Sequence, residues 1–124
     1  MKFLDSNILA YAFYDNEHMV QCQSAIKEGG VTDTLNLAEA CFIIEKETGN
    51  KELAIKSMRG LMKGDIILID ITSTVIFEAF KRAQQMKLSI FDTIHYVCAL
   101  MNNCESIVTY DKDFAAKDIP KVEP

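Results

Sequence analysis

An α/β fold with a parallel sheet covered by helices on both faces is predicted from two features of the sequence. Short apolar runs with strand character recur along the chain, most clearly at residues 2–5, 65–71 and 106–110. The segments between them carry the 3.6-residue apolar periodicity of amphipathic helices. Strands that alternate with helices in this way form parallel sheets. With 124 residues the chain is too short for two ordinary domains, so we expect a single domain over residues 1–124.

The first half of the chain is predicted to hold one or two strands and four helices. Residues 2–5 form the first strand, and residues 31–34 form either a very short strand or a turn. The pattern Asn36-Leu37-Ala38-Glu39 is typical of a capping box that begins a helix. The expected helices cover residues 8–14, residues 17–27 before a Gly-Gly pair, the segment from the capping box to Gly49, and residues 52–62.

The second half should complete the sheet. The sequence DIILIDI at residues 65–71 is the best candidate for a buried strand, because it is rich in Ile and bounded by Gly and Thr. In the helix that follows we expect Phe80 to face inward. The elements expected after this strand are helices over residues 73–87 and 90–102, a strand over 106–110, a turn or short helix over 111–116 and an edge strand over 121–123.

The composition excludes some classes of function. The net charge of -5 argues against a protein that binds nucleic acid through bulk positive charge, but not against an enzyme that holds phosphates through metal ions and a few local cations. Four cysteines without a CxxC pair and only two histidines make a zinc site a poor prediction. Reduced thiols fit a cytoplasmic protein. No apolar run has the length of a signal peptide core or a membrane span, so we expect neither.

Four acidic residues are predicted to meet at one edge of the sheet. Asp5 ends the first strand, and Asp111 directly follows the strand SIVTY. Glu39 and Asp92 fall in the first turns of helices, which in such folds begin near the same edge. Ligands of open parallel sheets bind outside the carboxyl ends of the strands. We therefore expect the four carboxylates to share one crevice.

A cluster of carboxylates suits metal-assisted hydrolysis of phosphodiesters. Mg²⁺ and Mn²⁺ prefer carboxylate and water oxygens, and such ions can activate a water molecule and stabilise charge on a phosphate. Each acid also has a structural explanation: Glu39 and Asp92 stand at capping-box positions, and Asp111 could cap the turn before Phe114. The joint placement of all four is what favours the metal site. His95 falls one turn after Asp92 and could line the pocket, but it is expected to be a half-buried helix residue.

Four motifs in order resemble those of the PIN-domain family, over nearly the whole chain. FLDSNILAY at residues 3–11 is similar to the family's hydrophobic-Asp-[Ser/Thr]-Asn opening, and NLAEACFIIEK at 36–46 resembles its helix-borne Glu. LSIFDTIHYVCAL at 88–100 resembles its Asp-bearing helix. IVTYDKDF at 107–114 resembles its T-x-D-x-x-F strand exit. The chain is most similar to the small VapC-type toxins of that family.

The resemblance implies a three-layer α/β/α fold with a central parallel sheet of four to five strands. It implies a Mg²⁺- or Mn²⁺-dependent ribonuclease, frequently a homodimer, that is neutralised by a separate antitoxin. Matched residue by residue, Asp5, Glu39 and Asp92 would hold the metal, and Asp111 would complete the acidic pocket. The supporting pocket would contain Ser6, Asn7, Thr109 and Asp113.

Two points stay open at the level of sequence. Many VapC-type proteins carry Asn where Asp111 stands and place the acid further on, so Asp113 is an alternative to Asp111. Lys46, Lys56 and Arg59 are candidates for RNA contacts, although a solvated basic face is the simpler explanation.

Two rival functions are considered. A phosphoryl-receiver switch is also a small α/β domain, but it wants an adjacent acidic pair after its first strand, where this chain has Asp-Ser-Asn. A catalytically inactive PIN fold that only binds a partner is the other rival, and the presence of all four acids counts against it.

Overall fold

The computed structural model describes residues 1–114 and 118–124. Within these residues five short strands form one parallel sheet in the order β3-β2-β1-β4-β5. The segment 31–34, which the sequence left open between a strand and a turn, contains a strand, and the edge strand expected over 121–123 is also present. The strands are β1 (Lys2–Leu4), β2 (Val31–Asp33), β3 (Ile67–Ile69), β4 (Ser106–Val108) and β5 (Lys121–Val122).

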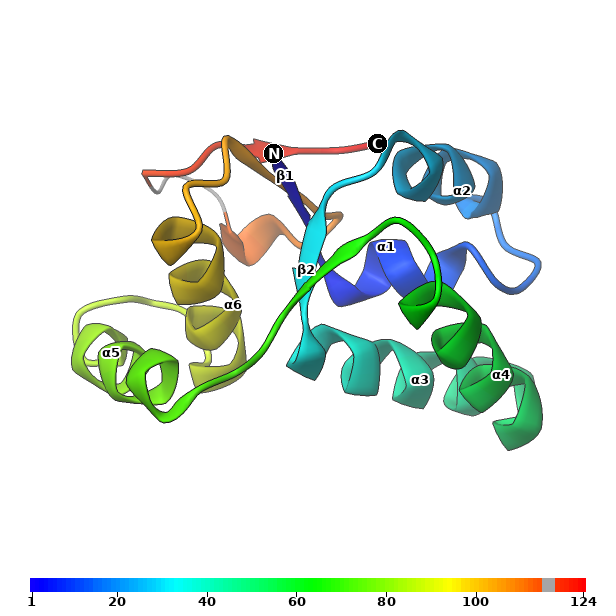
Figure 1. Cartoon of the computed structure of the whole chain (residues 1–124), viewed down its shortest axis with the longest axis horizontal. Coiled ribbons are helices and arrows are strands. Elements are labelled where there is room, and N and C mark those ends of the chain that lie inside the picture. Colours follow the sequence, from blue (N-terminus) through cyan, green and yellow to red (C-terminus); the bar gives the residue numbers. More distant parts are fainter. Residues whose placement is uncertain (115–117) are drawn as a thin grey trace.

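Helices cover both faces of the sheet, as predicted, and make three layers (Figure 1). One group packs on one face and consists of α1 (Ser6–Tyr11), α2 (Met19–Glu28), α3 (Thr34–Thr48) and α4 (Lys51–Met62). The opposite face carries α5 (Ser73–Ala83), α6 (Ile90–Met101) and the short 3₁₀ helix η1 (Lys112–Phe114). Of the helices described, none combines the length and apolar character needed to cross a membrane.

Side chains on the two faces of the central strands pack into two separate apolar cores. In β1, Phe3 packs among α5, α6 and η1, whereas the next residue, Leu4, packs among α1, α3 and α4. In β4, Ile107 and Val108 alternate in the same way. All four side chains are at most 3% exposed. This alternation follows from the two-residue period of a strand, and it makes β1 and β4 the centre of the sheet.

Three local predictions are corrected by the structure. The strand in residues 65–71 is short and lies at the edge of the sheet, so Ile67 is 51% exposed rather than buried. Helix α5 ends at Ala83, and Phe80 points outward with 58% of its surface exposed. Helix α3 begins at Thr34 with Asp33 as its N-cap, so Glu39 is not part of a capping box. Residues 115 and 116, the end of the turn expected over 111–116, lie outside the described residues.

The order of the strands creates a switch point between β1 and β4. The chain moves outward from β1 to β2 and β3 with α1–α4 on one face, then returns through α5 and α6 on the other face to place β4 on the free side of β1. Ligand crevices of parallel sheets lie at such points, outside the carboxyl ends of the strands. Asp5 and Asp111 follow these two strands.

Replacing Gly30 should cost stability, because a close backbone contact and a positive φ meet at this residue. A Cβ atom on Gly30 would lie 2.6 Å from the backbone oxygen of Lys2, and its φ of 149° disfavours other residues. Gly60, inside α4, has no such neighbour within 4 Å. We expect Gly30→Ala to lower the free energy of unfolding by about 1–3 kcal/mol, and Gly60→Ala to raise it by about 0.5–1 kcal/mol. Urea denaturation measures both free energies of unfolding. If Gly60→Ala lowered the free energy of unfolding as much as Gly30→Ala, the close contact at Gly30 would not explain the loss.

Candidate metal centre

Asp5 is fixed at the carboxyl end of β1 by its neighbours on β1, α1 and β4. It is 4% exposed, and the Ser6 N–H donates to its Oδ1 (2.8 Å) at the start of α1. Its Oδ2 accepts a 2.6 Å hydrogen bond from the Thr109 hydroxyl. The Asn7 amide donates to both Asp5 Oδ2 (3.4 Å) and Thr109 Oγ1 (3.3 Å). Burial raises the pKa of Asp5, although the hydrogen bond from Thr109 opposes the shift.

Asp92 approaches the other acids from the first turn of α6. Ser89 caps this helix by accepting a hydrogen bond from the Asp92 N–H (3.1 Å), so the predicted cap is real. The Asp92 carboxylate is half-buried. Burial and the charges of Asp111 and Asp5 raise its pKa to about 6. Asp92 therefore stands close enough to two other carboxylates to be repelled by them.

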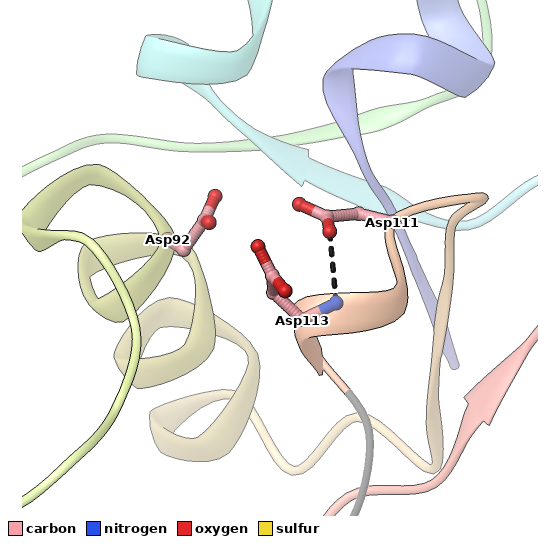
Figure 2. A group of neighbouring side chains, drawn as sticks. All are labelled: Asp92, Asp111 and Asp113. Atoms are coloured by element: carbon pink, nitrogen blue, oxygen red, sulfur yellow. Dashed lines mark hydrogen bonds between the residues drawn. The ribbon is translucent and has the colours of Figure 1, made fainter.

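Asp92, Asp111 and Asp113 form the tightest acidic group (Figure 2). One carboxylate oxygen from each lies within 4.8 Å of the other two. Asp111 is oriented from both sides: its N–H donates to Thr109 Oγ1 (2.9 Å), and its Oδ1 accepts from the Asp113 N–H (2.9 Å). Thr109 thus joins Asp5 to Asp111. Both alternatives left open by the sequence, Asp111 and Asp113, reach the same group.

Glu39 makes a different contact from the one the sequence suggested. Its Oε1 lies 2.6 Å from Nε2 of His95, whose Nδ1 lies 2.7 Å from Oδ2 of Asp33. The side chains of His95 and Asp33 are fully buried, and that of Glu39 is 31% exposed. Glu39 is therefore tied to α6 and to the end of β2 instead of standing within the tight acidic group.

The imidazole of His95 carries a positive charge in this setting. Burial alone would lower the pKa of His95, but hydrogen bonds to Asp33 and Glu39, together with their charges, outweigh it and raise the pKa to about 10. A cation enclosed in this way also acts on its surroundings: its charge counteracts the raised pKa of both Asp5 and Asp92. The positive charge of His95 thus partly balances the negative charges of Asp5 and Asp92.

Sequence reasoning missed Asp33 and underestimated His95. Asp33 stands directly at the end of a strand, which is the same signal that pointed to Asp5 and Asp111. The signal is weak at Asp33 because residues 31–34 fit either a very short strand or a turn. His95 was expected to be half-buried, but it is 0% exposed.

The candidate RNA contacts do not gather at the acidic residues. Lys46, Lys56 and Arg59 are exposed, on α3 and α4. Figure 1 places α4 at the opposite end of the molecule from α5 and α6. Lys56 and Arg59 line a shallow groove along α4 together with Lys51 and Lys63.

A hard divalent cation fits the side chains of Asp5, Asp92, Asp111 and Asp113. The donors are carboxylate oxygens, which Mg²⁺ and Mn²⁺ prefer. Within residues 1–114 and 118–124, none of Asp5, Asp92, Asp111 and Asp113 takes part in an ion pair. Burial is the main cause that raises the pKa of Asp5 and Asp92, and at Asp92 the charges of Asp111 and Asp5 add to it. A bound cation would favour the ionised form of both carboxyls.

The chain belongs to a known class of domain. A family model of the PIN domain matches residues 2–120, and the chain therefore belongs to the PIN domain family. No curated protein matches the sequence.

Solved structures with the same fold come from toxin–antitoxin systems. VapC20 of Mycobacterium tuberculosis, described as a toxin that cleaves the sarcin-ricin loop, has a TM-score of 0.85 at 14% identity, with 100% of both chains covered. A toxin–antitoxin complex from Klebsiella pneumoniae has a TM-score of 0.75 at 18% identity over 98% of this chain and 96% of that chain. VapBC2 of Rickettsia felis, bound to promoter DNA, has a TM-score of 0.72 at 16% identity over 98% and 97%. At these identities the likeness shows a shared fold.

Proposed function

We propose that this protein is a divalent-metal-dependent endoribonuclease, the toxin of a VapBC-type toxin–antitoxin pair. The observation that carries the proposal is the meeting of Asp92, Asp111 and Asp113, with Asp5 beside them, at the switch point of a PIN-domain sheet. Metal-assisted hydrolysis of a phosphodiester needs such carboxylates and needs no protein nucleophile.

Each acid has a defined part in the proposal. Asp5, Glu39, Asp92 and Asp111 would hold Mg²⁺ or Mn²⁺, and Asp113 would support Asp111. When bound, the cation would activate a water molecule and stabilise charge on the scissile phosphate. Ser6, Asn7 and Thr109 keep the Asp5 carboxylate in one orientation through the hydrogen bonds described above. This preorganisation is what distinguishes a metal site from acids scattered on a surface.

Partners follow from the structural neighbours. Two of the neighbours are toxin–antitoxin assemblies that match nearly the full length of this chain. We propose an antitoxin partner on this basis, and a homodimer as the resemblance to VapC-type toxins implies. RNA is the proposed substrate. Lys46, Lys56 and Arg59 would contact its backbone away from the cut, so neutralising them should raise KM and leave kcat nearly unchanged.

The proposal is tested by cleavage of labelled RNA, both single-stranded and structured. Purified protein should cut RNA with Mn²⁺ or Mg²⁺, lose this activity in EDTA and regain it when excess metal is returned. The variant Asp70→Asn is a matched control, because Asp70 is an exposed acid near the end of the edge strand β3 and is not part of the acidic group. Cleavage that persists in EDTA would contradict a metal mechanism.

Asp111 and Asp113 are separated by their variants. Asp111 is half-buried and oriented by two hydrogen bonds, whereas Asp113 is exposed. We expect Asp111→Asn to lower kcat by about 100-fold or more and Asp113→Asn by about 10-fold, since a bound metal contributes several kcal/mol. Single-turnover cleavage rates measure both. A larger loss in Asp113→Asn would reassign the fourth acid to Asp113.

The rival functions make different predictions. Receiver domains have the strand order 2-1-3-4-5, whereas this sheet has the order β3-β2-β1-β4-β5, so the topology does not favour a phosphoryl switch. An inactive PIN fold would bind its partner but leave RNA intact under every metal condition, which the same cleavage assay reveals.

A further inference from the structure

His95 bridges two carboxylates that come from different parts of the chain. Its Nδ1 lies 2.7 Å from Asp33, at the end of β2, and its Nε2 lies 2.6 Å from Glu39, on α3. Imidazole nitrogens point in fixed directions about one rigid ring, so these two contacts determine the position of both carboxylates relative to α6. The ring is fully buried and packs near Phe3, with centroids 6.4 Å apart.

The far side of this bridge is anchored to the backbone. Oδ1 of Asp33 accepts a 2.7 Å hydrogen bond from the Asn36 N–H, as the N-cap of α3, while Oδ2 faces His95. Asp33 is 0% exposed and cannot turn toward solvent. His95 is therefore held in place from Asp33, and it in turn holds Glu39.

Only one oxygen of Glu39 is used by the bridge. Oε1 contacts His95, and Oε2 makes no hydrogen bond within the residues that the structure describes. Glu39 remains partly exposed, whereas its two partners are fully buried. The charge of Glu39 also reaches Asp5, since it raises the pKa of that carboxyl. Glu39 therefore lies near enough to Asp5 for the two charges to interact.

We propose that His95 is a positioning residue that fixes Glu39 for metal binding, with Asp33 as its anchor. The inference rests on the proposed metal-dependent function and deepens it. Groups that orient metal ligands through hydrogen bonds commonly change metal affinity by about 10- to 100-fold when they are removed. Here the orienting group is a histidine and the ligand a carboxylate.

Glutamine is an informative replacement for His95. Its side-chain amide offers hydrogen-bond donors on one atom only, and its carbonyl oxygen would face a second carboxylate unfavourably. A Gln that pairs with the anchored Asp33 therefore leaves Glu39 without a donor and free to turn away. Removal of the His95 charge alone would strengthen metal binding instead of weakening it, because the acidic residues would then attract a cation more strongly.

The test is a calorimetric titration of the protein with Mn²⁺ alone, without RNA. We expect His95→Gln to weaken Mn²⁺ binding by about 10-fold, and Glu39→Gln to weaken it at least as much. If His95 acts through Glu39, adding His95→Gln to the Glu39→Gln variant should cause no further loss. In the Asp113→Asn background, which keeps the four proposed ligands, the loss caused by His95→Gln should persist. His18→Gln serves as a histidine control and should bind Mn²⁺ like the wild type.

Several results would overturn the inference. Unchanged or tighter Mn²⁺ binding by His95→Gln would show that His95 contributes charge or packing but no positioning. Additive losses in the double variant would show that His95 does not act through Glu39. If His95→Gln does not fold, Asp33→Asn replaces it, with a smaller loss expected that also vanishes in the Glu39→Gln background. A wild type that binds no Mn²⁺ would overturn the proposed function as well, whereas normal wild-type binding with no effect of the variants overturns this inference alone.

Discussion

Replacing Asp92 by Asn is expected to abolish RNA cleavage and at the same time to stabilise the metal-free protein. Asp92 is repelled by Asp111 and Asp5, and its pKa is raised to about 6 by burial and by these charges. The loss of a metal ligand should reduce kcat by at least about 10³-fold, because a bound metal contributes several kcal/mol and each 1.36 kcal/mol is about tenfold in rate. Function and stability should therefore change in opposite directions.

The stability gain should depend on pH in a defined way. A carboxyl whose pKa is raised on folding, here from 3.8 to about 6, resists ionisation in the folded state. Its destabilising effect is absent below pH 3.8, grows between pH 3.8 and 6, and is complete above pH 6. Because the Asp92 carboxyl is half-buried and partly screened by solvent, we expect a gain of about 1 kcal/mol for Asp92→Asn at pH 7.

Urea denaturation in EDTA measures this gain at pH 7 and at pH 4, where it should be much smaller. Asp70→Asn, the exposed control acid, should change neither cleavage nor stability measurably. With added Mn²⁺ the wild type should become the more stable of the two proteins. The ion stabilises the wild type by binding to its folded state and leaves Asp92→Asn nearly unaffected. An Asp92→Asn variant that cleaves RNA as well as the wild type would remove Asp92 from the site.

Replacing His95 by Phe is expected to cause the largest loss of stability among the variants considered. Phe has the size to fill much of the same space, but it leaves the carboxylate of Asp33 fully buried without its charged partner. Removing one member of a buried ion pair costs about 3–5 kcal/mol. Addition of Asp33→Asn to His95→Phe should recover part of this loss, because the unpaired charge is then removed.

The contribution of His95 should also fade at high pH. Its pKa is raised from 6.5 to about 10 in the folded protein. A base with a raised pKa stabilises the folded state fully below pH 6.5 and loses this effect as the pH rises through 10. Wild-type stability in EDTA should therefore fall between pH 7 and 10, and this fall should be much smaller in His95→Phe. The control variant His18→Gln should show the same dependence of stability on pH as the wild type. A His95→Phe variant with the stability and pH dependence of the wild type would show that the ion pair contributes nothing.

Much of the fold could be predicted from the sequence because the signals are local. Apolar periodicity separates strands from helices, and the positions of Asp5 and Asp111 at strand ends follow from the chain alone. The cap at Ser89 was readable for the same reason, since it joins residues three apart. These signals also placed the candidate metal ligands at one edge of a parallel sheet. Their role in metal binding stays a prediction.

The partners of His95 were decided only by the tertiary structure. His95 is separated from Asp33 by 62 residues and from Glu39 by 56, and no periodicity of the chain connects them. The order of strands likewise decided that residues 67–69 lie at an edge, although DIILIDI has the composition of a buried strand. Local patterns determine which backbone conformation a segment adopts. Which buried charges meet, and which strand stays exposed, depends on how the segments pack against one another.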